Sequence, residues 1–291
     1  MTDFDAYQRE LFWRFNKFRP PYLGSSYPPY HTGPYLEEYF FQEFIKKGKQ
    51  TEKFLIPVFW TNCYLSGIID GLQEELNKLD PEREYFCVSQ HDDAIKEVLP
   101  PKTIHFNAGG NKGGIPIPLV CSKISNKILP NFKEKTTFCS FVGSITHPIR
   151  FNLQSIFKNK AGFEFYSKPW TPQIDSSSED FFLKKTSESL FSLCPRGYGA
   201  SSFRFYEALQ LGAVPVFIYD KPWFPYEDSI DWDLFSIRIH ESEIDKIPDI
   251  LVEKTPFAAK MIDAGREAYE KFFSLNVLHD QISRILNAPK S

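Results

Sequence analysis

The stretch from residue 193 to residue 220, LCPRGYGASSFRFYEALQLGAVPVFIYD, contains two apolar runs separated by a polar turn and an amphipathic segment. Short apolar runs bounded by turn residues are typical of buried strands. Between the two runs, small and apolar residues recur at the spacing of one helix face, at Phe205, Ala208, Leu209 and Gly212. The order strand, turn, helix, strand predicts a βαβ unit and therefore a parallel sheet.

The same alternation of strands and helices runs through most of the chain. In the first half we expect strands at residues 53–60, 83–90, 102–109 and 115–122, and helices at 35–47, 61–79 and 92–99. Besides the βαβ unit above, the second half predicts strands at 137–144, 162–167 and 234–242, helices at 147–157 and 176–190, and three helical segments between 244 and 287. The chain is therefore predicted to be an α/β protein with mostly parallel sheets.

A polar segment at residues 125–135 separates the two series and is the best candidate for a linker. We predict two Rossmann-like domains that face a cleft, one at residues 1–130 and one at 131–291. Whether the last helix packs back on the N-terminal domain is left open.

The overall composition limits the partners that the chain can bind. A net charge of −3 gives no field that favours a nucleic-acid backbone or an anionic membrane. The N-terminus is charged and lacks the apolar region of a signal peptide, and no apolar run approaches the roughly 18 residues of a membrane span. Five widely spaced cysteines without a CxxC pair indicate reduced core residues. We therefore expect a cytoplasmic protein.

The turn after the first apolar run has the features of an anion-binding site. Ser201 and Ser202 stand where the N-cap of the helix is expected, and Gly197 and Gly199 allow the backbone to approach a ligand closely. Free backbone N–H groups at a helix N-terminus bind anions, and the guanidinium of Arg196 can bind phosphate oxygens with two hydrogen bonds.

Two charged residues of the helix, Arg204 and Glu207, fall outside its apolar face. A carboxylate one to two turns behind a diphosphate site is well placed to accept hydrogen bonds from ribose hydroxyls. Alternatively, the two side chains form only an i,i+3 pair on the surface of the protein. Their spacing alone does not distinguish these interpretations.

Residues 192–239 resemble the signature block of the exostosin-like glycosyltransferases, glycosyltransferase family 47. The motifs Cys-Pro-Arg-Gly, Ser-Ser, Tyr-Glu-Ala-Leu, Gly-x-x-Pro-Val and Ile-Asp-Trp follow one another in the same order without gaps. Weaker similarity, in YFCVSQHDDAI, GGNKGGIPIPL and SFVGSITHPIR, extends the resemblance to about residues 85–240. The resemblance implies a GT-B fold, an acceptor on the N-terminal domain, a nucleotide-sugar donor in the C-terminal domain, and inversion at the anomeric carbon.

On this resemblance, the second domain carries the residues that hold the donor. Glu207 would accept from the ribose, Tyr198 would shape the base or sugar pocket, and Arg204 would contact phosphate or hold Glu207. Arg150 would be a second phosphate cation, or else an ordinary solvated arginine of a helix N-terminus. The complete set of expected donor-binding residues is Gly143, Ser144, Arg150, Arg196, Tyr198, Ser201, Ser202, Arg204 and Glu207.

An inverting transfer also needs a general base on the acceptor side. His91, Asp92 and Asp93 follow a predicted strand, and His31 lies in a proline-rich segment just before Glu37 and Glu38, which form a second set with it. The alternative for the two aspartates is a helix N-cap and a first-turn acid. The catalytic candidates are therefore His31, His91, Asp92 and Asp93.

The sequence Asp231-Trp232-Asp233 matches the DxD pattern with which many other glycosyltransferases hold manganese. Here it stands where members of the resembled family carry Ile-Asp-Trp, and aspartates beside a tryptophan just before a strand commonly cap backbone N–H groups. We therefore expect no metal site and a metal-independent reaction.

We thus predict an inverting glycosyltransferase that moves a sugar from a UDP-sugar to a hydroxyl of a glycan or glycoprotein, with no cofactor. Xylose is the favoured sugar, with galactose and glucuronic acid as alternatives. Because the sequence departs from animal and plant members in showing no membrane anchor, a Golgi location and a polymerising activity are not carried over. Two other classes stay open, a non-catalytic nucleotide-sugar or glycan-binding module and a nucleotide-sugar-modifying oxidoreductase or epimerase. The oxidoreductase would need a GxGxxG turn after its first strand, which neither GGNKGG nor RGYG supplies.

Overall fold

The computed structural model describes residues 3–22, 24, 34–48, 50–119, 124 and 134–289, and the chain divides into two compact units. Unit 1 holds the described residues up to 24, those from 34 to 118 and those from 275 onward, and unit 2 holds those from 119 to 274. No helix formed by these residues has the length and apolar character that a membrane crossing requires.

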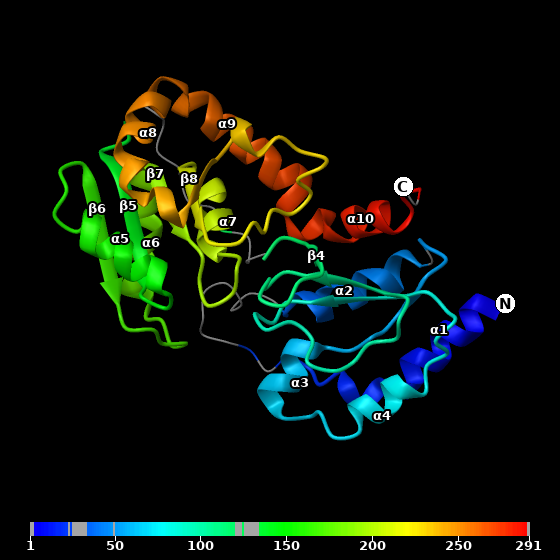
Figure 1. Cartoon of the computed structure of the whole chain (residues 1–291). Helices are drawn as coiled ribbons and strands as arrows, with labels where there is room; N and C mark the ends of the chain where they lie inside the picture. Colours follow the sequence, from blue (N-terminus) through cyan, green and yellow to red (C-terminus); the bar gives the residue numbers. More distant parts are fainter. Residues whose placement is uncertain are drawn as a thin grey trace. The chain divides into compact units, whose positions relative to one another are not determined.

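Unit 1 is built on a parallel sheet with the strand order β1-β2-β3-β4 (Figure 1). Strand β2 is buried at every position, as its apolar run predicts. The strands are β1 (Phe54–Leu55), β2 (Tyr85–Ser89), β3 (Thr103–Asn107) and β4 (Ile115–Pro116). The helices are α1 (Asp3–Arg14), η1 (Asn16–Phe18), α2 (Leu36–Lys47), α3 (Trp60–Ser66), α4 (Leu72–Asn77) and α10 (Leu275–Leu286).

The last helix of the chain, α10, belongs to unit 1 and packs on α2. The ring of His279 is buried and stacks on Phe40, with the ring centres 5.4 Å apart. At the edge of this contact, Nζ of Lys47 lies 2.6 Å from a carboxylate oxygen of Asp280. The N-terminal and C-terminal ends of the chain therefore contribute to one core.

Two helix predictions in unit 1 are wrong. The helix expected at 61–79 is broken into α3 and α4, because Gly67 and Gly71 adopt positive φ angles of 71° and 81°. No helix forms at 92–99, where the chain turns and Ala94 has a φ of 54°. A residue in the left-handed region ends a right-handed helix, so the apolar pattern there does not become one.

Unit 2 is a five-stranded parallel sheet with the order β6-β5-β7-β8-β9, in which strands alternate with helices along the chain (Figure 1). The strands are β5 (Thr137–Ser144), β6 (Phe163–Lys168), β7 (Ser189–Pro195), β8 (Val214–Tyr219) and β9 (Ile237–His240). The helices are α5 (Pro148–Phe157), α6 (Ser176–Glu188), α7 (Phe203–Gln210), η4 (Trp232–Leu234), η5 (Glu241–Lys246), α8 (Ile247–Lys254), η6 (Thr255–Phe257), α9 (Ala258–Ala268) and the π-helix η7 (Tyr269–Phe273). The predicted α/β class with two Rossmann-like units is confirmed.

The order of the strands in unit 2 reverses between β5 and β7. From β5 the chain passes to β6 on one side and then to β7 on the other. In doubly wound sheets, ligands bind beyond the carboxyl ends of the strands at such a point. The last residues of the two strands are Ser144 and Pro195, so the predicted anion-binding turn begins at the place where this topology favours a ligand.

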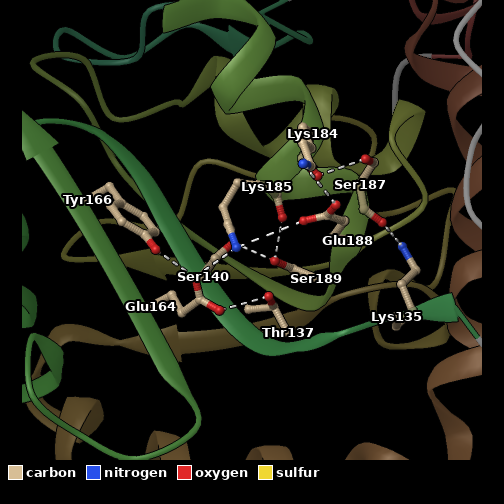
Figure 2. Close-up of polar contacts among 10 residues, drawn as sticks. All are labelled: Lys135, Thr137, Ser140, Glu164, Tyr166, Lys184, Lys185, Ser187, Glu188 and Ser189. Carbon is tan, nitrogen blue, oxygen red and sulfur yellow. Dashed lines mark hydrogen bonds and ion pairs between the residues drawn. The ribbon is translucent and has the colours of Figure 1, made fainter.

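At the other end of these strands, their amino ends, side chains form a network of polar contacts (Figure 2). Nζ of Lys185 lies 2.8 Å from the carboxylate of Glu164, which also accepts from the hydroxyl of Thr137 at 2.9 Å. The buried hydroxyl of Ser189 donates to that of Ser140 at 2.7 Å. These contacts join β5 to β6 and to β7 near the amino ends of the strands, so side chains of unit 2 itself occupy this end of the sheet.

Lys135 lies beside this network, and its environment predicts that the stability of unit 2 depends on pH. Its Nζ donates to the carbonyl oxygens of Ser187 at 2.5 Å and Gly212 at 2.7 Å, and burial, together with the charge of Arg266, lowers its pKa from 10.5 to about 8. Between these two values the unfolded chain binds more protons than the folded chain, so stability should rise with pH. In urea unfolding, we expect wild type to gain roughly 1–3 kcal/mol over Lys135→Met between about pH 8 and about pH 10.5. Equal pH profiles of the two proteins would contradict this.

The cysteines follow the sequence prediction as far as the structure describes them. Four of them are buried and form no disulfide bond with one another, namely Cys63, Cys87, Cys139 and Cys194. Cys121 lies outside the described residues.

Candidate donor-binding site

The loop that joins β7 to α7 is held close to the sheet. The backbone N–H of Arg196 donates to the carbonyl of Ile218 in β8 at 3.0 Å, and that of Gly197 donates to the carbonyl of Ser201 at 3.2 Å. Ser201 and Ser202 are buried, and Ser202 is the N-cap residue, as predicted. Its side chain makes no capping hydrogen bond, and the first turn of α7 contains no acidic residue. The positive end of this helix therefore has no side-chain anion in its first turn.

Arg196 is almost fully buried beneath this loop. Its Nη1 lies 2.7 and 2.8 Å from the two carboxylate oxygens of Asp220, the residue that directly follows β8. Its Nη2 donates to the carbonyl of Tyr198 at 2.8 Å. The side chain of Tyr198 itself is 59% exposed. The guanidinium thus ties the loop to the end of a neighbouring strand.

Arg150 is buried as well and joins the ends of β5 and β7. Its three nitrogens donate to the carbonyls of Arg196, Ser144 and Pro195 at 2.9, 2.9 and 3.1 Å. The sequence interpretation of a solvated surface arginine is therefore wrong. The charge of Arg150 lies at the switch point, while these donors hold the backbone on both sides of it.

Arg204 and Glu207 form a pair at 2.8 Å, but the pair is not on the surface. Glu207 is 6% exposed, and burial raises the pKa of its carboxyl while the charge of Arg204 lowers it. The guanidinium lies over the ring of Phe182 at 4.2 Å, and a Cβ added to Gly143 would be 3.0 Å from its Nη2. Arg204 therefore reaches from α7 to the end of β5, across the switch point.

Part of this pair remains available for further hydrogen bonds. Within the described residues, Nε of Arg204 is buried without a partner, and the carboxylate of Glu207 has no partner other than Arg204. The structure thus brings the predicted residues of the turn, of α7 and of the end of β5 together at one edge of unit 2.

Two residues at this edge were missed by the sequence predictions. Asp220 directly follows an apolar run that was predicted as a strand, so the rule that selected Arg196 would have selected it too. His147 is the N-cap of α5, and its side chain accepts from the N–H of Ile149 at 3.3 Å. Burial, with the positive charge of Arg196, lowers the pKa of His147.

The predicted catalytic residues His91, Asp92 and Asp93 lie together in the turn after β2 of unit 1. The N–H of Asp93 donates to the ring of His91 at 3.2 Å, and the amide of Asn111 donates to the carboxylate of Asp93 at 3.2 Å. Burial lowers the pKa of His91. Because no helix follows, the alternative of a helix N-cap and first-turn acid is wrong for both aspartates. His31 lies outside the described residues.

The second acidic set contributes a buried carboxyl to unit 1. Oε1 of Glu37 accepts from the N–H and hydroxyl of Thr61 and from the N–H of Gln90, at 3.1, 2.7 and 2.9 Å. Burial raises its pKa. Glu38 accepts from the backbone N–H of Tyr22 at 3.0 Å. Both residues thus connect α2 to neighbouring segments of unit 1.

The two aspartates of the DxD pattern have separate structural partners. Asp231 caps η4 by accepting from the N–H of Asp233 at 3.0 Å, as expected for a capping residue. Asp233 pairs with Arg238 at 3.2 Å. Over the described ranges, no group of three or more His, Cys, Asp or Glu side chains is placed to hold a metal ion.

Comparison with known proteins places the loop and α7 within a known domain. The model of the Exostosin GT47 domain matches residues 103–254, just over half of the chain. The chain is similar to the Exostosin-1 homolog of Caenorhabditis elegans, with 35% identity over 100 residues, which are 34% of this chain and 26% of that protein. It is also similar to the probable glucuronoxylan glucuronosyltransferase IRX7 of Arabidopsis thaliana, with 31% identity over 140 residues, covering 44% of this chain and 29% of that protein.

These matches span less than a third of either curated relative. Among solved structures, the chain is similar to WaaG, a glycosyltransferase involved in lipopolysaccharide biosynthesis. That match has 11% identity and a TM-score of 0.42, and it covers 78% of this chain and 83% of that one.

Proposed function

We propose, from the premise that the chain belongs to the Exostosin GT47 domain family, that it is a glycosyltransferase that uses a UDP-sugar as donor and a glycan hydroxyl as acceptor. The observation that carries the proposal is the set of three arginines around the uncapped N-terminus of α7, at the switch point of a parallel sheet. Such a place suits a diphosphate, because backbone N–H groups and fixed positive charges stabilise it together.

In this proposal the diphosphate lies on the loop 196–202, close to Gly143 and Ser144. Arg204 supplies the side-chain hydrogen bonds, since its Nε has no partner in the described part of the chain. The donors of Arg150 are directed to backbone carbonyls, so it contributes mainly its charge. Ser201 and Ser202, which are buried residues of this loop, lie at the N-terminus of α7.

The ion pair of Arg204 and Glu207 would also position the nucleoside. Glu207 accepts hydrogen bonds from the ribose hydroxyls with the carboxylate oxygen that Arg204 leaves available. Burial raises the pKa of Glu207, and the charge and hydrogen bond of Arg204 act in the opposite direction, which favours the ionised carboxylate. We propose that Tyr198, whose side chain is largely exposed, contacts the base or the sugar.

The transfer itself is an inverting displacement. The acceptor oxygen attacks the anomeric carbon and loses its proton to a base, while the bond to the diphosphate breaks and the diphosphate leaves with the electron pair. We propose His91, Asp92 or Asp93 of unit 1 as that base. Arginine charges and a helix N-terminus stabilise the leaving diphosphate, so we propose a reaction that needs no metal.

For the sugar, we retain xylose, galactose and glucuronic acid as candidates. The name of the relative IRX7, a probable glucuronoxylan glucuronosyltransferase, supports glucuronic acid among the three. A panel of UDP- and GDP-sugars, incubated with the protein without acceptor, tests the proposal. Slow release of UDP from one sugar nucleotide is expected, and EDTA should leave its rate unchanged. Release from none of them would contradict the proposed donor, and loss of turnover with EDTA would contradict the metal-free reaction.

A further inference from the structure

Asp220 and Arg196 form a largely buried ion pair at the carboxyl ends of the strands of unit 2. The side chain of Arg196 is 7% exposed and that of Asp220 is 23% exposed, and one guanidinium nitrogen contacts both carboxylate oxygens. Strands β7 and β8 are neighbours, with Pro195 opposite Ile218, so the two residues follow directly after adjacent strand ends. The pair therefore links two parts of the sheet edge that are 24 residues apart in sequence.

The other donors of Arg196 act on the loop. Nη2 donates to the carbonyl of Tyr198 at 2.8 Å, and Nε contacts the carbonyl of Gly197 at 3.4 Å. A guanidinium is planar, so fixing one of its nitrogens on a carboxylate fixes the direction of the other two. Asp220 thus sets the orientation in which Arg196 holds residues 197 and 198.

A carboxylate this close to a diphosphate site can act in two opposite ways. It can weaken anion binding by cancelling the charge of Arg196, or it can strengthen binding by keeping the loop in shape. Although its partial burial acts in the opposite direction, the hydrogen bonds and charge of Arg196 lower the pKa of Asp220, so the carboxylate is ionised at neutral pH. Removing it would leave a buried cation without its partner, which is costly. Since Arg196 donates to the loop carbonyls, the second effect should dominate.

We propose that Asp220 is a positioning residue of the donor site, which acts through Arg196 to hold the loop 196–202 in the shape that receives the diphosphate. The inference rests on the proposed function, because it takes a nucleoside diphosphate as the ligand of this loop.

The test is the affinity of the full chain for UDP, measured by calorimetry. Asp220→Asn is expected to weaken UDP binding roughly tenfold. Asp220→Glu, which keeps the carboxylate, is expected to retain most of the wild-type affinity. In an Arg196→Met background, Asp220→Asn should cause no further loss, because its effect passes through the arginine. The control is Asp233→Asn, which removes one of the two acidic partners of Arg238 elsewhere in unit 2 and should bind UDP like wild type.

Tighter binding by Asp220→Asn would overturn the proposal and assign Asp220 the charge-cancelling role. Equal losses in the wild-type and Arg196→Met backgrounds would overturn it as well, since a general loss of stability acts independently of Arg196. If Asp220→Asn does not fold, the test is Asp220→Glu, whose longer side chain keeps the charge and should bind UDP within a few-fold of wild type, with no further change in the Arg196→Met background. A folded Asp220→Glu that changes the affinity equally in both backgrounds would overturn the proposal. If the wild-type protein binds no UDP, the proposed function itself is contradicted. If the wild-type protein binds UDP and Asp220→Asn binds it equally well, only the proposed role of Asp220 is contradicted.

Discussion

Arg204→Ala is expected to weaken UDP binding roughly a hundredfold and to abolish sugar transfer. The change removes the guanidinium that lies against Gly143 and over the ring of Phe182. It also leaves the buried carboxyl of Glu207 without its partner, so the charge and hydrogen bond that oppose the effect of burial are lost and its pKa rises further. A neutral Glu207 is a poorer acceptor for ribose hydroxyls. Calorimetry with UDP measures the loss of binding, and a transfer assay with the sugar nucleotide that the panel selects measures the loss of activity.

Two further variants separate the site from general effects of charge. Arg238→Ala removes an arginine that pairs with Glu227 and Asp233, and its UDP affinity should equal that of wild type. Arg204→Lys keeps the charge but not the planar donor group, so we expect an affinity between those of wild type and Arg204→Ala. Wild-type UDP binding by Arg204→Ala would contradict the proposed donor site.

Gly109→Ala should destabilise the protein by roughly 3 kcal/mol or more. A Cβ at this position would lie 2.4 Å from the carbonyl oxygen of His91 and 2.5 Å from Cα of Asp92, both of which are backbone atoms. Such a contact is relieved only by moving the turn after β2, which contains the proposed base. The free energy of unfolding from urea titration measures the loss.

The control for this variant is Gly197→Ala, whose Cβ would have its nearest neighbour at 3.4 Å, the guanidinium of Arg150. An ordinary contact of this kind should change stability by less than about 1 kcal/mol. Equal stabilities of Gly109→Ala and wild type would show that the turn at His91 yields easily, and that Gly109 does not fix it.

The fold of unit 2 could be predicted from the sequence in detail. Strand β5 occupies residues 137–144 as expected, and α5 begins one residue later than predicted because His147 is its N-cap. These segments have strong periodic patterns and clear boundary residues, such as the proline at the start of α5. Local signals of this kind suffice when the chain's own neighbours determine the structure.

Unit 1 was harder to predict, because contacts distant in sequence decide its turns. The apolar pattern at 92–99 fits a helix, but Ala94 has a positive φ, the backbone of Asp92 lies close to Gly109, and the N–H of Asn111 donates to the carbonyl of Asp92. These partners are far enough away that no local pattern includes them. The same applies to the site: spacing suggested the contact of Arg204 with Glu207, whereas the partners of Arg150 and Arg196 depend on which strand ends are adjacent.

The return of α10 to unit 1 has a consequence for the way the protein is made. The chain leaves unit 1 after residue 118 and re-enters it at Leu275, so the aromatic contact between Phe40 and His279 joins residues that the whole of unit 2 separates in the sequence. During synthesis, the face of α2 that α10 covers is exposed until α10 has emerged from the ribosome. A fragment limited to residues 103–254, although it includes the family's matched region, would contain only two strands of unit 1 and none of the helices that shield them.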